Sequence, residues 1–203
     1  MIPVALIKGD KYMRIKSLIG VGCLIACMVL PSAVFAQDYA PVEVFGGLSV
    51  MRVSEMKVDS YPIFGSGGMT GWGASIAFNL NPNWAIKADF SGQYAKIGDS
   101  DYTLNRNNIL GGVQYNIPVN DSFNVFVEGL AGFANFRLNG ESLNGIGIAA
   151  GGGVDWKFSD RFAWRVAQMN YTFARASHSE WEDQSAKVNG FRFQTGILIY
   201  LGK

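Results

Sequence analysis

The sequence is poor in the residues that most often perform chemistry. Its 203 residues include two cysteines and one histidine. Both cysteines, Cys23 and Cys27, lie within the first 36 residues. Once that segment is removed the chain has no thiol, which excludes disulfide scaffolds, cysteine zinc sites and thiol catalysis, and which suits an oxidising compartment.

Long apolar runs and basic clusters are also missing. After residue 36 no segment approaches the roughly 18 consecutive apolar residues of a membrane helix, which excludes a helical membrane protein. Lys and Arg are dispersed, and without residues 1–36 the chain carries 13 of them against 15 Asp and Glu, a net charge of −2. We therefore expect no nucleic-acid partner.

The first 36 residues have the organisation of a secretory signal peptide. Basic residues precede an apolar run from Leu18 to Leu30, and Val34 and Ala36 occupy the −3 and −1 positions of a cleavage site. Cleavage after Ala36 predicts a mature domain of residues 37–203. Translation starting at Met13 remains an alternative, since Met13-Arg14-Ile15-Lys16 already supplies the charged segment.

Two other interpretations of this segment stay open. An uncleaved helix would anchor the chain, although the 13 residues from Leu18 to Leu30 are short for a span. The residues Leu24-Ile25-Ala26-Cys27 have the types found before a lipid-modified cysteine, although the apolar run continues past them.

From Pro41 onward the chain repeats one unit, in which apolar residues alternate with small or polar ones and a turn follows. Short turns rich in Pro, Asn, Asp and Ser are centred on Pro82, Asn120 and Asp160, at intervals of 38 and 40 residues. Each interval holds two strands of membrane length and one loop. The pattern predicts an all-β fold, an eight-stranded antiparallel up-and-down transmembrane β-barrel. Its strands are expected at 41–53, 72–80, 84–94, 102–117, 123–138, 145–158, 162–175 and 191–201.

The two faces of each expected strand differ in polarity. In 84–94, Ile86 and Phe90 alternate with Lys87 and Asp89, which predicts apolar side chains toward lipid and polar ones toward the barrel axis. A soluble, lipocalin-like carrier predicts the reverse arrangement. The strand at 162–175 changes phase, because Gln168 falls on the face that begins with apolar residues, so we predict a β-bulge there.

Aromatic residues gather near the short turns. They predict a girdle at the periplasmic interface, where both termini should also lie. The opposite rim should hold longer loops at 54–68, 97–101, 139–144 and 176–187. The expected girdle consists of Trp84, Tyr115, Phe123, Trp156, Phe158, Phe162, Trp164 and Tyr200.

These segments resemble a known family. The leader, the eight alternating segments and strand endings such as Gly153-Val154-Asp155-Trp156-Lys157-Phe158 are similar to small bacterial outer-membrane β-barrels related to the OmpA transmembrane domain and OmpX. The resemblance covers essentially all of the mature chain. It implies export through the periplasm to the outer membrane of a Gram-negative cell. The implied partners are membrane lipid, lipopolysaccharide and the insertion machinery, for which Tyr200 would supply the terminal aromatic residue.

The charged residues expected inside the barrel form the candidate site. An eight-stranded barrel is only wide enough for side chains to fill it, so buried charges there have to pair. We expect a sealed, salt-bridged interior with a structural role, and a narrow ion or solute channel is the alternative. The candidate residues are Lys87, Asp89, Glu128, Asp155, Lys157, Arg165 and Arg192.

No catalytic, cofactor-binding or metal site is expected. His178 lies beside Ser179 and Glu180, which suggests a lipid-modifying hydrolase, but the spacing differs from that of known lipid A deacylases. The run 145–150 matches a relaxed dinucleotide fingerprint but lacks the helix that must follow it. Loop acids such as Asp99 and Glu182 are candidates for a divalent cation, or are ordinary solvated residues. The sequence therefore predicts a non-enzymatic envelope protein whose surface ligand it does not identify.

Overall fold

The computed structural model describes residues 39–58, 61–64, 67–96, 103–138, 141–177 and 185–202. All of them belong to one of two compact units of the chain, Asp38–Lys203. The predicted signal peptide, residues 1–36, lies outside the described residues. So do His178, its neighbours Ser179 and Glu180, and the loop acids Asp99 and Glu182.

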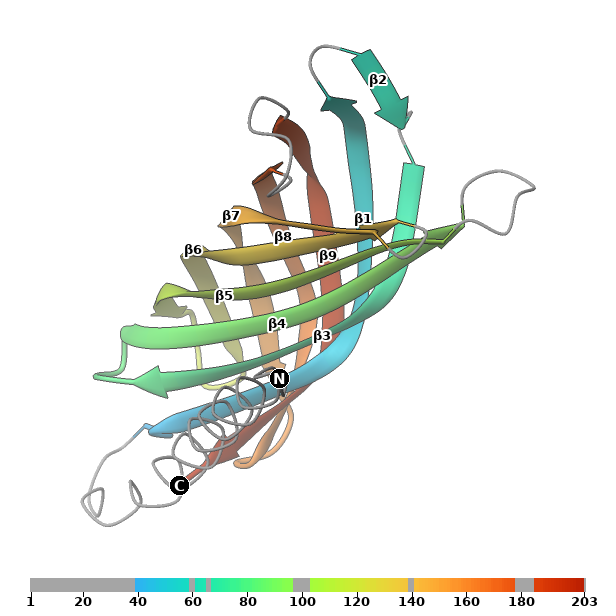
Figure 1. The fold of residues 1–203 in the computed structure, drawn as a ribbon. Coiled ribbons are helices and arrows are strands. Elements are labelled where there is room, and N and C mark those ends of the chain that lie inside the picture. The colour runs from blue at the N-terminus through green and yellow to red at the C-terminus, as the bar shows by residue number, and fades with distance from the viewer. Residues whose placement is uncertain are drawn as a thin grey trace, which may run out of the picture. The chain divides into compact units, whose positions relative to one another are not determined.

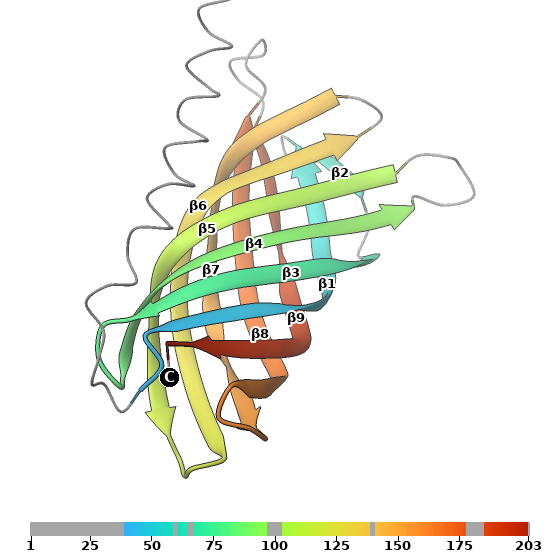
Figure 2. The same ribbon diagram turned by 90° about the horizontal axis from the view of Figure 1, so that it is seen from below.

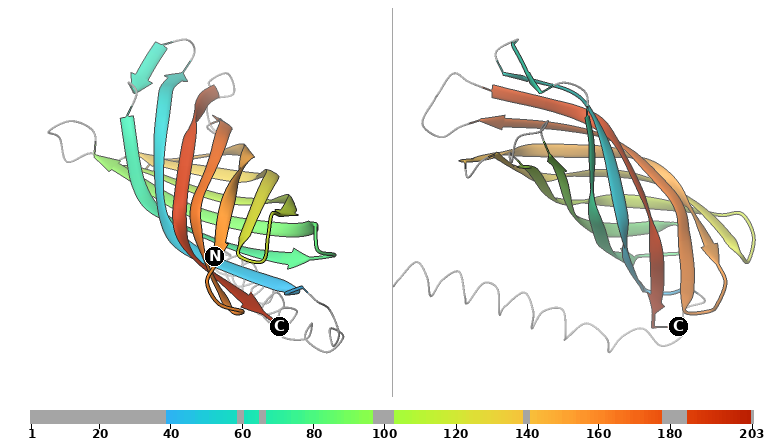
Figure 3. Two further views of the ribbon diagram at one scale, coloured as in Figure 1. Left: turned by 180° about the vertical axis from the view of Figure 1, so that it is seen from behind. Right: turned by 90° about the vertical axis from the view of Figure 1, so that its right-hand side faces the viewer.

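The described part of the chain is a closed antiparallel β-barrel (Figures 1 and 2). Eight long strands pair in the order β1-β3-β4-β5-β6-β7-β8-β9, and β9 returns to pair with β1, as Figure 3 shows from behind. The short strand β2 pairs only with β1 and lies outside the ring. No helix among the described residues is long and apolar enough to cross a membrane. The strands are β1 (Val42–Val58), β2 (Tyr61–Phe64), β3 (Gly67–Asn79), β4 (Trp84–Lys96), β5 (Thr103–Pro118), β6 (Phe123–Leu138), β7 (Glu141–Lys157), β8 (Phe162–Ser177) and β9 (Ser185–Leu201).

The three short turns lie where the sequence predicts them, and asparagine side chains shape two of them. The Asn81 side-chain oxygen accepts hydrogen bonds from the backbone N–H of Asn83 (2.9 Å) and Trp84 (2.8 Å). Asn120 does the same for Ser122 (2.9 Å) and Phe123 (2.8 Å). Where the chain reverses, these side-chain hydrogen bonds replace the backbone hydrogen bonds between strands, which explains why Asn suits these positions.

At the opposite rim the predicted loop boundaries are wrong, because the strands run further. β1 continues to Val58, β2 lies inside the predicted loop 54–68, and β7 and β9 begin six residues or fewer before their expected starts. Beyond the membrane a strand needs no apolar face. The backbone N–H and C=O groups still require partners, so the ladder continues through polar and glycine residues.

The outward face of the barrel is apolar, as predicted. Leu48, Ile86, Val127 and Phe133 are 70, 52, 50 and 74% exposed, whereas Lys87 is 1% exposed. This polarity is the opposite of that of a soluble carrier, so the lipocalin-like alternative is wrong.

β8 contains the predicted bulge. Its pairing with β9 shifts register between Arg165 and Gln168, and its pairing with β7 shifts between Val154 and Asp155. One extra residue is therefore accommodated at Val166–Ala167. As a result Arg165 and Gln168, although three residues apart, are both buried inside the barrel.

Most of the expected girdle surrounds the short-turn rim. Trp84 packs edge-on against Tyr115 with ring centroids 4.8 Å apart, and Trp156 packs against Trp164 at 6.4 Å. Tyr200 is the exception, because it packs inside the barrel mouth against the buried cluster of Phe45, Ala163 and Leu198. The prediction for Tyr200 is wrong. Side chains alternate between the two faces of a strand, and Tyr200 lies an even number of residues from Gln194, whose side chain is buried inside the barrel.

Candidate functional site

Three ion pairs occupy the centre of the barrel, and together they use six of the seven candidate residues. Lys87 Nζ lies 2.6 Å from Glu128 Oε2. Arg165 contacts both carboxylate oxygens of Asp155, at 2.7 and 2.9 Å. Arg192 contacts both oxygens of Asp89, at 2.7 and 3.2 Å. These side chains are at most 1% exposed, and the two arginine pairs have the bidentate geometry that makes such bonds strong.

The seventh candidate, Lys157, does not join these pairs. Its side chain is 27% exposed at the short-turn rim, where Nζ lies 3.9 Å from Asp160 Oδ1. The carboxylate of Asp160 is 92% exposed, so solvent screens this contact.

Neutral amides connect the ion pairs. Gln168 Nε2 and Asn170 Nδ2 donate to Glu128 Oε1 at 2.6 and 2.7 Å. Gln168 Oε1 accepts a hydrogen bond from Arg165 Nη1 at 3.1 Å, and Asn170 Oδ1 accepts one from Arg192 Nη2 at 3.5 Å. Gln168 and Asn170 therefore join all three carboxylate–cation pairs into one network.

Aromatic rings line the same space. The Arg165 guanidinium lies over Phe126 and Phe45, at 4.2 and 4.9 Å from the ring centroids, and Lys87 Nζ is 5.2 Å from that of Phe126. Gly153 leaves the room that Phe126 and the backbone oxygen of Ala167 need, because a Cβ built at Gly153 would meet that oxygen and would lie 2.7 Å from the ring. The rings exclude water from the pairs and face the cations with their electron-rich surfaces.

Toward the loop rim, the network ends at a buried arginine. Ser91 Oγ accepts from Arg192 and from Asn108, and Asn108 Oδ1 accepts from Arg106 Nε at 3.2 Å. Arg106 also contacts Met51 Sδ at 3.1 Å and lies 5.2 Å from the Phe136 ring centroid. An apolar cluster fills the barrel interior around these residues: Met51, Val53, Met69, Leu104, Ala134, Phe136, Ala174 and Val188.

Toward the short-turn rim, amides carry the network to Glu43. Gln114 accepts from Lys87 and donates to Asn116 Oδ1 at 2.8 Å. Asn116 contacts Asn79 at 3.4 Å, and Asn79 Nδ2 donates to Glu43 Oε1 at 2.8 Å. Among the described residues the buried charges comprise four acids and four bases, so the interior is neutral.

The candidate set from the sequence left out Glu43, Arg106, Gln114, Gln168 and Asn170. The alternation of side chains along a strand could have identified Glu43, Arg106 and Gln114, because each lies an even number of residues from other buried residues of its own strand. For Gln168 and Asn170 the alternation fails as a guide, because the bulge before them reverses which residues face inward. Arg106 was obscured for another reason, because it belongs to a polar segment that suggests an exposed position above the membrane.

The family follows from a comparison with known domains. The outer membrane protein beta-barrel domain family matches residues 22–197. The chain belongs to this family.

Solved structures of outer-membrane barrels have the same fold. Neisserial surface protein A (NspA) is 13% identical with a TM-score of 0.59, and the match covers 80% of this chain and 98% of that one. OprG from Pseudomonas aeruginosa is 13% identical with a TM-score of 0.55, and the match covers 83% of this chain and 99% of that one. At these identities the likeness concerns the fold alone. No curated protein matches the sequence.

Membership of this family identifies the membrane in which the barrel lies. The protein lies in the outer membrane of a Gram-negative cell, where the apolar face contacts membrane lipid and lipopolysaccharide. In such barrels short turns face the periplasm and longer loops face outward. The girdle and the Glu43 end therefore belong to the periplasmic side.

The described residues do not form a dinucleotide, hydrolase or metal site. The run 145–150 lies within β7 and continues as strand to Lys157, so the helix that a dinucleotide site needs is missing. The residues proposed for hydrolysis, His178, Ser179 and Glu180, lie outside the described residues. In the described part of the chain no three His, Cys, Asp or Glu side chains are grouped as a metal site.

Proposed function

We propose that this protein is a non-enzymatic, integral outer-membrane barrel with a sealed interior, and that its role in the envelope is structural or is exercised through its surface loops. One observation carries the proposal: a single hydrogen-bonded network links side chains from all eight long strands. A network that engages every strand stabilises the closed barrel and fills the space through which a solute would pass.

The strongest competing function is a narrow channel, and the polar lumen favours it. Two features support the sealed form instead. Each central cation is held by a carboxylate, with both oxygens engaged in the two arginine pairs. The apolar cluster around Met51 and Phe136 adds a water-poor layer on the loop side.

Planar-bilayer recordings distinguish the two functions. We expect the purified protein to insert without reproducible conductance steps. The double variant Lys87→Ala/Glu128→Ala removes both side chains of one central ion pair, and the folded variant should show small conductance steps. Ile86→Ala on the lipid face should show none. Reproducible steps from the unaltered protein would establish the channel and refute the sealed interior.

The non-enzymatic part of the proposal has its own test. Cells with and without the protein should yield identical lipid A mass spectra. A loss of acyl chains that depends on His178 would instead support the hydrolase.

We also propose that the chain is exported by a signal peptide cleaved after Ala36 and folded into the membrane by the insertion machinery. The basic residues, apolar run and cleavage-site residues support export. N-terminal sequencing of the membrane-extracted protein should begin at Gln37. A start before Leu18, or a lipid-modified Cys27, would contradict this.

A further inference from the structure

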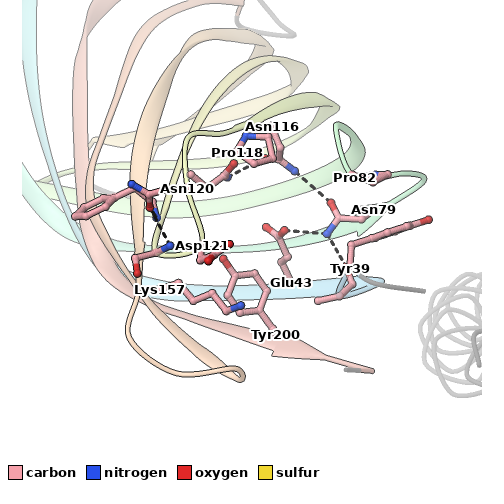
Figure 4. A pocket seen from close by; sticks show the side chains of 14 residues that line it. Tyr39, Glu43, Asn79, Pro82, Asn116, Pro118, Asn120, Asp121, Lys157 and Tyr200 are labelled. Carbon is pink, nitrogen blue, oxygen red and sulfur yellow. Dashed lines mark hydrogen bonds between the residues drawn. The ribbon is translucent and has the colours of Figure 1, made fainter. Parts of the chain in front are cut away.

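A cavity of about 370 Å³ lies inside the periplasmic mouth of the barrel (Figure 4). Its volume falls within the range of roughly 300 to 1,000 Å³ typical of small-molecule sites. The start of β1, the turns that follow β3 and β5, the start of β6, and the ends of β7 and β9 form its walls. Its polar side chains include those of Glu43, Asn79, Asn116, Asp121, Lys157 and Tyr200.

One of the side chains in the wall of this cavity is a buried carboxylate, that of Glu43. Glu43 is 6% exposed, and it forms no ion pair with any described residue. Oε1 accepts the Asn79 amide at 2.8 Å, but Oε2 accepts no hydrogen bond from the part of the chain that the structure describes. Burying a carboxylate without a matching donor or cation is costly. Each of the other three buried acids has a cation of its own.

The surroundings of Glu43 are rich in acceptors. Asn79 Nδ2 donates hydrogen bonds both to Glu43 and to the backbone oxygen of Ala40, and Asn79 Oδ1 accepts one from Asn116 Nδ2. A second carboxylate, that of Asp121, and the phenol of Tyr200 line the same hollow. Figure 4 shows Glu43 and Tyr200 directed into this space, with Asn79 beside Glu43. Lys157 also lines the hollow, so the lining carries two carboxylates against one ammonium group, and no described cation forms an ion pair with Glu43.

The size and ligand set favour an organic cation over a metal ion. Calcium takes six to eight oxygen ligands, often from several carboxylates, whereas no three acidic, His or Cys side chains are grouped among the described residues. A primary ammonium group needs only a few acceptors within hydrogen-bond distance. The apolar atoms of Tyr39, Pro82, Pro118 and Phe123 provide contact for an attached carbon chain.

We propose that this periplasmic cavity binds a small primary ammonium ion, whose nitrogen pairs with Glu43 and whose carbon chain occupies the rest of the hollow. The inference is independent of whether the barrel conducts. It concerns only the mouth, which lies on the periplasmic side of the central ion pairs.

Calorimetric titration of the full-length protein in detergent micelles tests the proposal, with n-butylammonium as the probe and n-butanol as its uncharged counterpart. We expect saturable binding of n-butylammonium and much weaker binding of n-butanol. Glu43→Gln keeps the size of the side chain but removes its charge, and should weaken binding about tenfold or more, as expected for the loss of a charged hydrogen bond. Glu141→Gln removes a carboxylate from the first residue of β7, at the opposite rim of the barrel, and should leave binding unchanged.

A second measurement keeps the proposal falsifiable if Glu43→Gln does not fold. In NMR spectra of the unaltered protein, n-butylammonium should shift the side-chain amide of Asn79 and leave that of Asn170 in place. The proposal is overturned if no saturable binding occurs, if Glu43→Gln binds as well as the unaltered protein, or if the Asn79 signal does not move.

Discussion

Arg165 and Gln168 lie three residues apart on β8, yet both point into the barrel, and Arg165 Nη1 donates a hydrogen bond to Gln168 Oε1 at 3.1 Å. In a regular strand, residues three apart face opposite sides. The bulge at Val166–Ala167 absorbs the odd residue, so the Asp155 pair and the Glu128 cluster share one side chain, Gln168.

Deleting Val166 should therefore be tolerated. The deletion gives a regular strand in which Arg165 and Gln168 still face inward, at the cost of the local twist that the bulge supplies. Deleting Met169 instead should abolish folding, because Asn170 and Thr172 would turn toward lipid. Gel migration before and after boiling measures folding, since a folded barrel runs differently from the unfolded chain. Equal behaviour of the two deletions would contradict the bulge.

Removing one partner of a central pair should be far more damaging than removing both. Arg192→Met leaves Asp89 buried without its cation, and should lower the free energy of unfolding by about 3–5 kcal/mol. Adding Asp89→Leu should recover most of that loss. Urea unfolding in lipid vesicles provides the values, and Asp160→Ala at the exposed rim should change them by about 1 kcal/mol or less. A double variant no better than Arg192→Met would show that the pair does not act as a unit.

Glycines of the barrel should differ sharply in their tolerance of a methyl group. Gly153→Ala places Cβ against the backbone oxygen of Ala167 and against the Phe126 ring, and should cost about 1–3 kcal/mol of unfolding free energy. Gly129→Ala meets no atom within 4 Å and should be neutral or slightly stabilising. The same urea titration checks both. A comparable loss at Gly129 would mean that strand propensity rather than packing sets the effect.

A charge on the lipid face should be costly only at depth. Ile148 on β7 is 50% exposed, well away from the girdle residue Trp156 on the same strand. Ile148→Lys should therefore lose about 2–4 kcal/mol of folding free energy in vesicles. Val119→Lys, in the short turn after β5, should lose less than about 1 kcal/mol. Equal losses at the two positions would place the membrane elsewhere along the barrel.

The fold was predictable because strand periodicity and turn chemistry are local properties. The alternation of Ile86 and Phe90 with Lys87 and Asp89 determines which side faces lipid, and Asn81 and Asn120 mark the turns. The pairing inside the barrel was not predictable. Arg192 meets Asp89 from 103 residues away, across strands that are not neighbours, and only the curvature of the closed sheet decides such contacts.

The pairing of Arg192 on β9 with Asp89 on β4 has a consequence for assembly. β9 is the last strand in the chain, and its arrival both seals the sheet against β1 and delivers the cation that Asp89 needs. A half-built form lacking β9 would keep one sheet edge unpaired and one acid unneutralised in the middle of a bilayer. Insertion is thus expected to proceed as one all-or-none step, with no long-lived seven-stranded species on the way.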